Sequence, residues 1–286
     1  MSTPDVDALR QNRTAQMSAA MNATGRPMWL TFHCIHQMDR GHQSSPSFAE
    51  WCAEDGNSWR IGPDHHDNWG SLDAVIQVLG GQAEHGRPGR WNDPDFLMTG
   101  GAGCDEYVPG KRCPGMTETE YRTEFSLWSI AAASMILSTD PRNMTDFMRE
   151  TLLHPEMLAI HADELGVSGG VAATHTAPAD GCSQDGYCQV WVRPLADGGW
   201  AMALYNRNNA TATITGQFAS LPVAGAAMVA GGTARQLAPP TSLAVRDVWA
   251  GKDLGTFAGG YTAKAIKAHG CVVLKLTKPG HKSPGK

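Results

Sequence analysis

Two short stretches of the chain gather residue types that could bind a sugar and act on it. Residues 59–69 (WRIGPDHHDNW) place an arginine and carboxylates between two tryptophans, and residues 90–97 (RWNDPDFL) place Asp93 and Asp95 on either side of a proline. Carboxylates hydrogen-bond hydroxyl groups, and an aromatic ring stacks on the apolar C–H groups of a sugar. The two stretches therefore indicate a carbohydrate site.

The same residues have simpler interpretations. Asp93 and Asp95 could cap the turn around the proline between them, as aspartate does at helix N-termini and turns. Arg60 and Asp64 could form an ordinary salt bridge. The histidines of residues 33–36 (HCIH) could be satisfied polar residues rather than catalysts. The spacing alone leaves these alternatives open.

Histidines and cysteines could instead hold a metal ion. His65 and His66 lie beside carboxylates, but adjacent histidines point in different directions and the sequence offers no distant third ligand. Cys104 and Cys113 could bind zinc, but no second pair with metal-ligand spacing accompanies them. We therefore expect no metal and no cofactor.

The net charge and the composition disfavour several classes of protein. The 286 residues carry 23 Lys+Arg against 28 Asp+Glu, a formal net charge of −5, and only 18% of them are charged. A nucleic-acid binder, a polybasic membrane binder and a disordered chain are all disfavoured. No run approaches the roughly 20 apolar residues of a membrane span. We expect neither a nucleic-acid partner nor a membrane partner.

The first two-thirds of the chain alternates between expected strands and helices. Strands are expected at 27–34, 58–61, 90–97 and 135–138, and helices at 5–24, 68–79, 118–133 and 144–153. The helix at 118–133 opens on a capping box formed by Thr117 and Glu120. Four strand–helix units in succession predict a parallel α/β architecture. Such folds place active sites at the carboxyl ends of their strands, where both acidic stretches fall.

The pattern changes after about residue 167. Short runs of alternating or β-branched residues are separated by turn residues, without helical periodicity. Strands are expected at 188–194, 199–206, 210–217, 241–249 and 270–277. This part of the chain predicts an all-β module, a small sandwich. Residues 278–286 predict a disordered tail.

Cysteines and glycosylation sequons are typical of an exported protein. Two of three cysteine pairs close short loops rich in glycine and aspartate, as disulfides do. The pairs are Cys34 with Cys52, Cys104 with Cys113, and Cys182 with Cys188, and Cys271 is left over. Sequons begin at Asn12, Asn22, Asn143 and Asn209. Residues 1–5, however, have neither the basic start nor the apolar run of a secretory signal.

Several ordered blocks of sequence lie across both parts of the chain. They are residues 22–27 (NATGRP), 67–69 (DNW), 91–95 (WNDPD), 115–128 (GMTETEYRTEFSLW), 140–144 (DPRNM), 161–166 (HADELG) and 245–257 (VRDVWAGKDLGTF). Together the blocks resemble the α-galactosidases of glycoside hydrolase family 27, in family order. The resemblance runs from about residue 17 to residue 277 and so covers nearly the whole chain.

This resemblance implies a (β/α)8 barrel followed by an antiparallel β-sandwich, with the four expected strands as barrel strands five to eight. We therefore expect residues 1–166 to be the C-terminal half of a catalytic barrel and residues 167–277 to be the sandwich domain. A half barrel leaves strand edges unpaired. We accordingly expect a truncated chain that folds poorly alone and lacks activity.

The resemblance also implies roles for individual residues. Asp64 matches the family's general acid/base. The substrate-binding residues that we expect are Arg60, which would hold the sugar hydroxyls, Asp93 and Asp95 on the floor of the site, and the neighbouring Trp59 and Phe96. The family's nucleophile lies in a Lys-x-Asp-x-Cys setting, which this sequence lacks. Because a retaining glycosidase needs two carboxyl groups about 5–5.5 Å apart, no covalent intermediate is expected from this chain.

Substrate specificity stays open in the sequence. The family follows its fifth-strand cysteine with Glu-Trp, whereas Cys34, the implied disulfide partner of Cys52, is followed by Ile35 and His36. The resemblance implies a small-molecule or oligosaccharide substrate with terminal α-galactosyl residues. The alternatives are a non-catalytic sugar-binding remnant, an α-N-acetylgalactosaminidase or a β-arabinopyranosidase. We expect the full-length protein to be secreted or lysosomal/vacuolar, and oligomerisation stays open.

Overall fold

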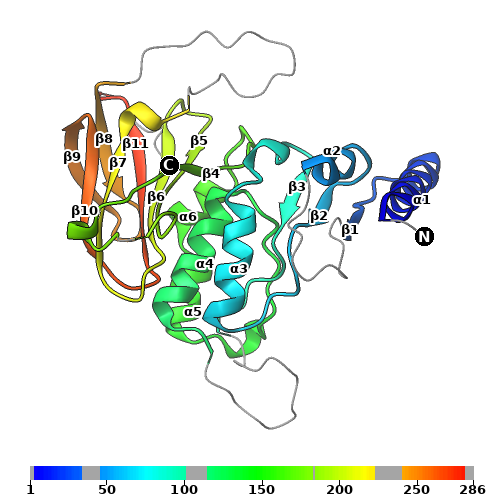
Figure 1. Cartoon of the computed structure of the whole chain (residues 1–286), viewed down its shortest axis with the longest axis horizontal. Helices are drawn as coiled ribbons and strands as arrows, with labels where there is room; N and C mark the ends of the chain where they lie inside the picture. The colour runs from blue at the N-terminus through cyan, green and yellow to red at the C-terminus, as the bar shows by residue number, and fades with distance from the viewer. Residues whose placement is uncertain (1–2, 34–45, 101–114, 183, 223–239, 281–286) are drawn as a thin grey trace.

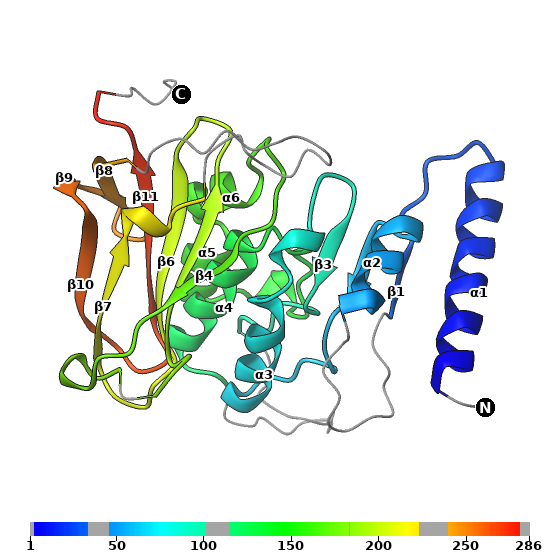
Figure 2. The same cartoon turned by 45° about the horizontal axis from the view of Figure 1, so that its top comes forward.

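Residues 3–33, 46–100, 115–182, 184–222 and 240–280 are described by the computed structural model. Within these ranges an α/β part is followed along the chain by a β-sandwich (Figure 1). Figure 2 shows helix α1 at one end of the molecule and the sandwich at the other. None of the described helices is long and apolar enough to cross a membrane.

Short parallel strands form the sheet of the α/β part, in the order β1-β2-β3. They are β1 (Thr31–His33), β2 (Ser58–Arg60) and β3 (Trp91–Asp93). A parallel bridge between Leu97 and Leu137 continues the pattern where the fourth strand was predicted. The strand predicted over 90–97 ends early, because Pro94 has no N–H to donate and Asp95 has a left-handed φ of +87°.

Six helices belong to the α/β part in the described ranges of the chain. They are α1 (Thr3–Ala23), α2 (Pro46–Asp55), α3 (Trp69–Leu79), α4 (Glu118–Ile130), α5 (Asp146–Leu152) and α6 (Pro155–His161). Short 3₁₀ turns lie at Ala83–His85, Pro141–Asn143, Pro178–Asp180 and Phe218–Ser220. Helices α2 and α6 were not predicted. Helix α6 has only 7 residues and opens on Pro155, which suits a first helical turn but leaves too little length for a clear period.

Helix α4 begins with the predicted capping box and is then buried along most of its length. The Glu120 N–H donates to Thr117 Oγ1 at 3.3 Å, and the Thr117 N–H donates to Glu120 Oε2 at 2.7 Å. Ten of the 13 residues of α4 are buried. The helix ends at Ile130, before the predicted residue 133, and Ala132 takes a left-handed φ of +50°. A helix buried this completely must lie between two packed layers.

The β-sandwich consists of a six-stranded antiparallel sheet, in the order β4-β5-β6-β11-β8-β9, and a two-stranded sheet, β10-β7. The strands are β4 (Gly170–Thr174), β5 (Cys188–Pro194), β6 (Trp200–Asn206), β7 (Ala212–Gln217), β8 (Ser242–Asp247), β9 (Lys252–Ala258), β10 (Gly260–Ile266) and β11 (Cys271–Thr277). Strands β5, β6, β7, β8 and β11 were predicted. Strand β9 was missed because most of its residues are exposed, so it has no apolar alternation to read.

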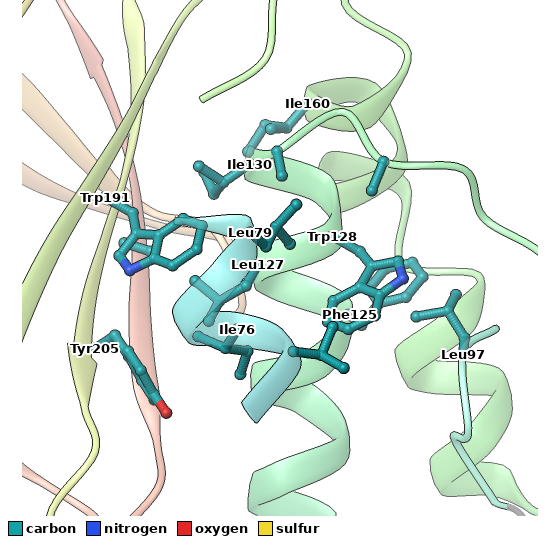
Figure 3. Close-up of a cluster of buried hydrophobic side chains, with 14 of the residues drawn as sticks. Ile76, Leu79, Leu97, Phe125, Leu127, Trp128, Ile130, Ile160, Trp191 and Tyr205 are labelled. Carbon is teal, nitrogen blue, oxygen red and sulfur yellow. The ribbon is translucent and has the colours of Figure 1, made fainter. Parts of the chain in front are cut away.

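Strands β5 and β6 are buried on both faces. On one face Val190 and Leu204 belong to the core between the two sheets of the sandwich. On the other face Trp191 and Tyr205 share a second core with Leu127 of α4 (Figure 3). The six-stranded sheet is therefore a middle layer, between the small sheet and the helices of the α/β part.

Ion pairs also join the two parts of the chain. Arg207 Nη2 of the sandwich lies 2.6 Å from Asp73 Oδ2 of α3. Arg246 of β8 binds both carboxyl oxygens of Glu156 in α6, at 2.7 and 2.8 Å, and hydrogen bonding to this guanidinium lowers the pKa of Glu156. Because these groups are partly exposed, each pair contributes modestly to stability.

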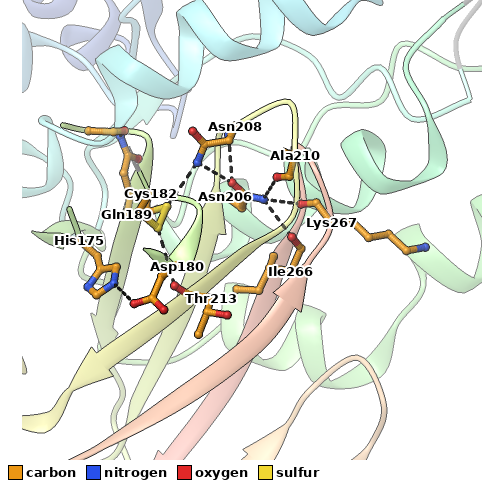
Figure 4. The surroundings of a disulfide bond; sticks show 12 residues. His175, Asp180, Cys182, Gln189, Asn206, Asn208, Ala210, Thr213, Ile266 and Lys267 are labelled. Carbon is orange, nitrogen blue, oxygen red and sulfur yellow. Dashed lines mark hydrogen bonds and ion pairs between the residues drawn. A yellow bond between two sulfur atoms is a disulfide. The ribbon is translucent and has the colours of Figure 1, made fainter. Parts of the chain in front are cut away.

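The predicted disulfide between Cys182 and Cys188 is present, at the edge of the sandwich (Figure 4). Nearby, the Asn206 side chain, at the end of β6, donates to three backbone carbonyl oxygens. They are those of Ala210, before β7, and of Ile266 and Lys267, at the end of β10. The other predicted pairs are not tested, because Cys34, Cys104 and Cys113 lie outside the described residues.

The shared core yields a prediction about cooperativity. Replacing the fully buried Leu127 by Ala should lower the free energy of unfolding by about 2–5 kcal/mol, because it leaves a cavity in the core common to both parts. Denaturant unfolding followed by tryptophan fluorescence measures the loss. Leu153→Ala, at a position 60% exposed, is the matched control and should change the free energy by less than about 0.5 kcal/mol. Two well-separated transitions in the wild-type curve would contradict a common core.

Candidate active site

The two acidic stretches meet at the carboxyl edge of the parallel sheet. Arg60 ends β2 and Asp93 ends β3, and the two residues are direct partners in the strand register. His33, the last described residue of β1, is the partner of Arg60 on its other side. The sheet therefore brings together side chains that are far apart in the sequence.

Arg60 is the centre of this cluster. Its Nη2 atom lies 2.7 Å from Asp95 Oδ2 and 3.3 Å from Asp64 Oδ1, and it donates to the carbonyl oxygen of Pro63 at 2.8 Å. The Arg60 side chain is only 12% exposed. Its Nε atom is buried and finds no hydrogen-bond partner among the residues that the structure describes. One guanidinium thus pairs with two carboxylates and compensates part of their negative charge.

Asp95 fixes the loops around this arginine. Its Oδ2 atom accepts the backbone N–H of His65 at 2.9 Å, and its Oδ1 atom accepts the N–H of Phe96 at 2.8 Å. Its own N–H donates to Asp93 Oδ1 at 2.9 Å. The two aspartates therefore do hold the turn around Pro94, as the simpler interpretation required. The same contacts also bind the β2–α3 loop to the segment after β3.

Asp64 is the most accessible acid of the cluster. Its side chain is 64% exposed and forms an ion pair with Arg60. Phe96, in the segment after β3, is 45% exposed, whereas Trp59 is fully buried. The Trp59 Nε1–H donates to Asn92 Oδ1 at 3.1 Å inside the sheet. A direct stacking contact between Trp59 and a sugar is thus blocked by burial.

A buried polar network lies below the cluster and was not foreseen from the sequence. The Tyr121 hydroxyl donates to Asp67 Oδ1 at 2.7 Å, and His65 Nε2 lies 3.0 Å from Glu124 Oε1. Burial and the hydrogen bond to Asp67 raise the pKa of Tyr121 well above its usual value. The sequence feature that could have indicated these contacts is Glu124, a charged residue among the large apolar residues of α4.

The metal interpretation of His65 and His66 finds no support in this geometry. Both ring nitrogens of His65 have protein partners, Glu124 and Ser71, whereas the neighbouring His66 is exposed. In the described ranges, no group of three or more histidine, cysteine, aspartate or glutamate side chains could hold a metal ion.

A cavity of about 450 Å³ lies away from Asp64, at the seam between the two parts of the chain. It is lined by Trp91 at the start of β3 and by Arg193 of β5, among others. Arg193 is fully buried, and its Nη1 donates to three carbonyl oxygens at the ends of α4 and α6, those of Ser129, Ile160 and His161. Arg193 therefore holds two helix ends against the sandwich.

Comparison with known proteins places this fold in a class. The family model described as "Alpha galactosidase A" matches residues 4–163, and the model of the "Alpha galactosidase C-terminal beta sandwich domain" matches residues 185–276. The class is that of glycoside hydrolases with a (β/α)8 barrel and a C-terminal β-sandwich, and the described α/β part belongs to the barrel. The chain belongs to the α-galactosidase family, glycoside hydrolase family 27.

Individual relatives agree with this assignment. The chain is 34% identical to alpha-galactosidase 3 of Arabidopsis thaliana over 93% of this chain and 51% of that protein. It is 31% identical to a probable alpha-galactosidase of Dictyostelium discoideum, over 93% of this chain and 59% of that protein. It thus spans little more than half the length of these curated relatives.

Solved structures share the fold. The crystal structure of alpha-galactosidase I from Mortierella vinacea superposes with a TM-score of 0.70 at 24% identity, covering 97% of this chain and 65% of that one. Other matches carry different activities in their names. One is the alpha-N-acetylgalactosaminidase of Homo sapiens, at 29% identity over 67% of this chain and 42% of that protein. Another is the structure of a β-L-arabinopyranosidase from Geobacillus stearothermophilus. It superposes with a TM-score of 0.72 at 18% identity and covers 96% of this chain and 55% of that one.

The environment of Asp93 yields a prediction about pH. Burial raises the pKa of the Asp93 carboxyl, and the negative charge of Asp95 adds to the rise, while the Asp95 N–H and the Arg60 charge oppose it. The folded state therefore holds this proton to higher pH than the unfolded chain does. The stability linked to Asp93 is full below the usual pKa of about 4 and is lost as pH rises through the raised value.

Asp93→Asn removes this titration and keeps an oxygen that can accept the Asp95 N–H. The free energy of unfolding of the variant, minus that of the wild type, should therefore increase between about pH 4 and pH 7. Denaturant unfolding at both values measures the difference. Asp64→Asn removes one negative charge at an exposed position and is the control. A difference that stays flat or falls with pH would show that Asp93 does not gain its proton affinity from folding.

Proposed function

We propose that this chain carries the acid/base and sugar-binding side of a retaining glycosidase site that acts on terminal α-galactosyl residues. The observation that carries the proposal is the convergence of Arg60, Asp64 and Asp95 at the carboxyl edge of the parallel sheet, with Arg60 bonded to both acids. Active sites of (β/α)8 barrels lie at this edge. Membership of the α-galactosidase family supports the choice of substrate.

Each residue of the cluster has a proposed role. Asp64, exposed and held at one oxygen by Arg60, is the general acid that protonates the leaving oxygen and the base that later activates water. Arg60 holds the sugar hydroxyls beside the two acids with which it pairs. Asp93 and Asp95 brace the floor, and Phe96 offers an exposed aromatic edge or face. Trp59 contributes from below, by holding Asn92 in the sheet.

The proposal assigns no residue of this chain as the second carboxylate of the mechanism, the nucleophile. In a retaining enzyme it attacks the anomeric carbon while the first group protonates the departing oxygen. The 286 residues contain no Lys-x-Asp-x-Cys motif. We therefore propose that these residues bind and protonate, and that they do not form the covalent intermediate by themselves.

Two other functions stay in view. The missing motif favours a sugar-binding protein without catalysis, and relatives named as an α-N-acetylgalactosaminidase and a β-L-arabinopyranosidase favour a different sugar. Ile35, where the family has glutamate, bears on this choice and lies outside the described residues. Titration with galactose, N-acetylgalactosamine and arabinose separates these substrates.

We also propose a domain division and an exported location. A boundary near residue 166 is supported by family matches that end at 163 and resume at 185. Export to the cell exterior, lysosome or vacuole is supported by the Cys182–Cys188 disulfide and by the exposure of all four sequon asparagines.

Sugar binding tests the proposal most directly. The folded chain should bind galactose saturably, and Arg60→Lys should weaken binding by at least about tenfold, because lysine cannot reproduce the fork of N–H donors. Protein-observed NMR titration measures both. Arg142→Lys is the matched control, since Arg142 also pairs with an aspartate, Asp140, at 2.7 Å but is 85% exposed. No saturable binding by the folded wild-type chain would overturn the proposed function.

The role of Asp64 is tested in a chimera that joins this chain to the part of the Arabidopsis relative that it does not cover, where the family resemblance places the nucleophile. There Asp64→Asn should lower kcat for aryl α-galactosides with poor leaving groups by about 10²–10⁴-fold, the usual contribution of general acid catalysis. Substrates with good leaving groups need less protonation and should lose less in glycosylation. Equal turnover by the variant and the parent on poor leaving groups would remove Asp64 from this role.

A further inference from the structure

Within the described part of the chain, the side chain of the acid/base candidate Asp64 pairs with Arg60, and its loop is held by the neighbouring residues. Its side chain is 64% exposed and meets Arg60 at 3.3 Å. The next residue, His65, is 3% exposed and is held through both its backbone and its ring. The His65 N–H donates to Asp95 Oδ2 at 2.9 Å. The placement of Asp64 therefore depends on how firmly His65 is fixed.

Glu124 fixes His65 from helix α4. The Glu124 side chain is fully buried, and its Oε1 atom lies 3.0 Å from His65 Nε2. The same Oε1 accepts the Met98 N–H at 2.8 Å, and Oε2 accepts the Thr99 hydroxyl at 2.9 Å. A buried carboxylate is costly unless donors surround it, and here the donors come from two separate loops. One side chain of α4 thus ties the loop after β2 to the segment after β3.

The hydrogen bonds around His65 agree on one tautomer. Ser71 Oγ accepts the backbone N–H of His66 at 2.8 Å, which leaves the Ser71 hydroxyl proton free to donate to His65 Nδ1, 3.1 Å away. The ring proton then resides on Nε2 and points at the Glu124 carboxylate. The Glu124 carboxylate can only accept, which places a proton on Nε2, and a neutral ring then accepts the Ser71 proton at Nδ1.

Two further residues on the same stripe of α4 act on the same loops. Tyr121 donates to Asp67 Oδ1 at 2.7 Å in the β2–α3 loop. Trp128 donates from Nε1 to the Asp95 carbonyl at 3.2 Å, and its ring centroid lies 5.9 Å from that of His65. Residues 121, 124 and 128 are spaced at i, i+3 and i+7, which places them on one helical face.

We propose that Glu124 is a positioning residue of the active site: through the His65 Nε2 contact it sets the position of the loop that carries Asp64, relative to the segment after β3. The inference rests on the proposed function only in naming Asp64 as the residue that is positioned. Met98 and Thr99 hold the Glu124 carboxylate in place, and His65, which contacts this carboxylate, is the residue next to Asp64.

Glu124→Met tests this role, because it keeps the bulk of the side chain and removes its acceptor oxygens. NMR of ring-¹⁵N-labelled histidine should find His65 protonated at Nε2 in the wild type and a tautomer mixture in the variant. Exchange of the His65 amide should accelerate by at least about tenfold beyond the change expected from global stability. Glu124→Gln, which retains an acceptor oxygen, should restore the wild-type tautomer. An unchanged tautomer and unchanged exchange in Glu124→Met would overturn the proposal.

Thr99→Val is the matched control. It removes a donor from the same carboxylate, at the oxygen that does not face His65, and should leave the tautomer as in the wild type. If Glu124→Met does not fold, Ser71→Ala replaces it and should also produce a tautomer mixture. A wild-type His65 protonated at Nδ1 would overturn the proposal without any variant. None of these measurements needs a sugar, so failure to bind galactose would refute the proposed function while leaving this test standing.

Discussion

Burial of helix α4 on almost every side is the constraint on which the rest of the structure depends. Its apolar residues close the core shared with β5 and β6, while its polar residues face the loops at the carboxyl edge of the parallel sheet. A helix in this position cannot tilt or slide without opening one of the two contacts, because both are close-packed. Packing against the sandwich and the geometry at Arg60 and Asp64 are therefore fixed by one element.

The charged cluster illustrates how one set of contacts can serve structure and chemistry together. Arg60 is flanked by carboxylates that also hold the turn at Pro94, so the acids that brace the fold are those proposed to surround a sugar. Removing the arginine would leave acidic groups close together with less compensation, and partly buried charges tolerate this poorly. Removing Arg60 should therefore lower the stability of the fold as well as the affinity for a ligand.

The sequence was sufficient for an α/β part followed by a β-sandwich, but not for helices α2 and α6 or for the polar contacts beneath the charged cluster. Arg60 falls in the short strand expected at 58–61, whereas Asp93 falls inside the strand expected at 90–97, which ends earlier, at Asp93. Trp59 could not be recognised as buried, since a three-residue strand gives no periodicity to assign its face. Glu124 looked like an ordinary helical charge, because only the packing of two loops against α4 turns that face inward. Strand β9, largely exposed, carried no apolar pattern at all.

The middle position of the six-stranded sheet bears on how such proteins can be recombined. A domain attached by a linker can be exchanged between homologues as a cassette. Here Trp191 and Tyr205 project from the sandwich into the core of the α/β part, and Arg193 closes the ends of two of its helices. A sandwich transplanted from a relative would bring a mismatched half of that core. Exchanging one part therefore requires matching substitutions on the facing side of the other.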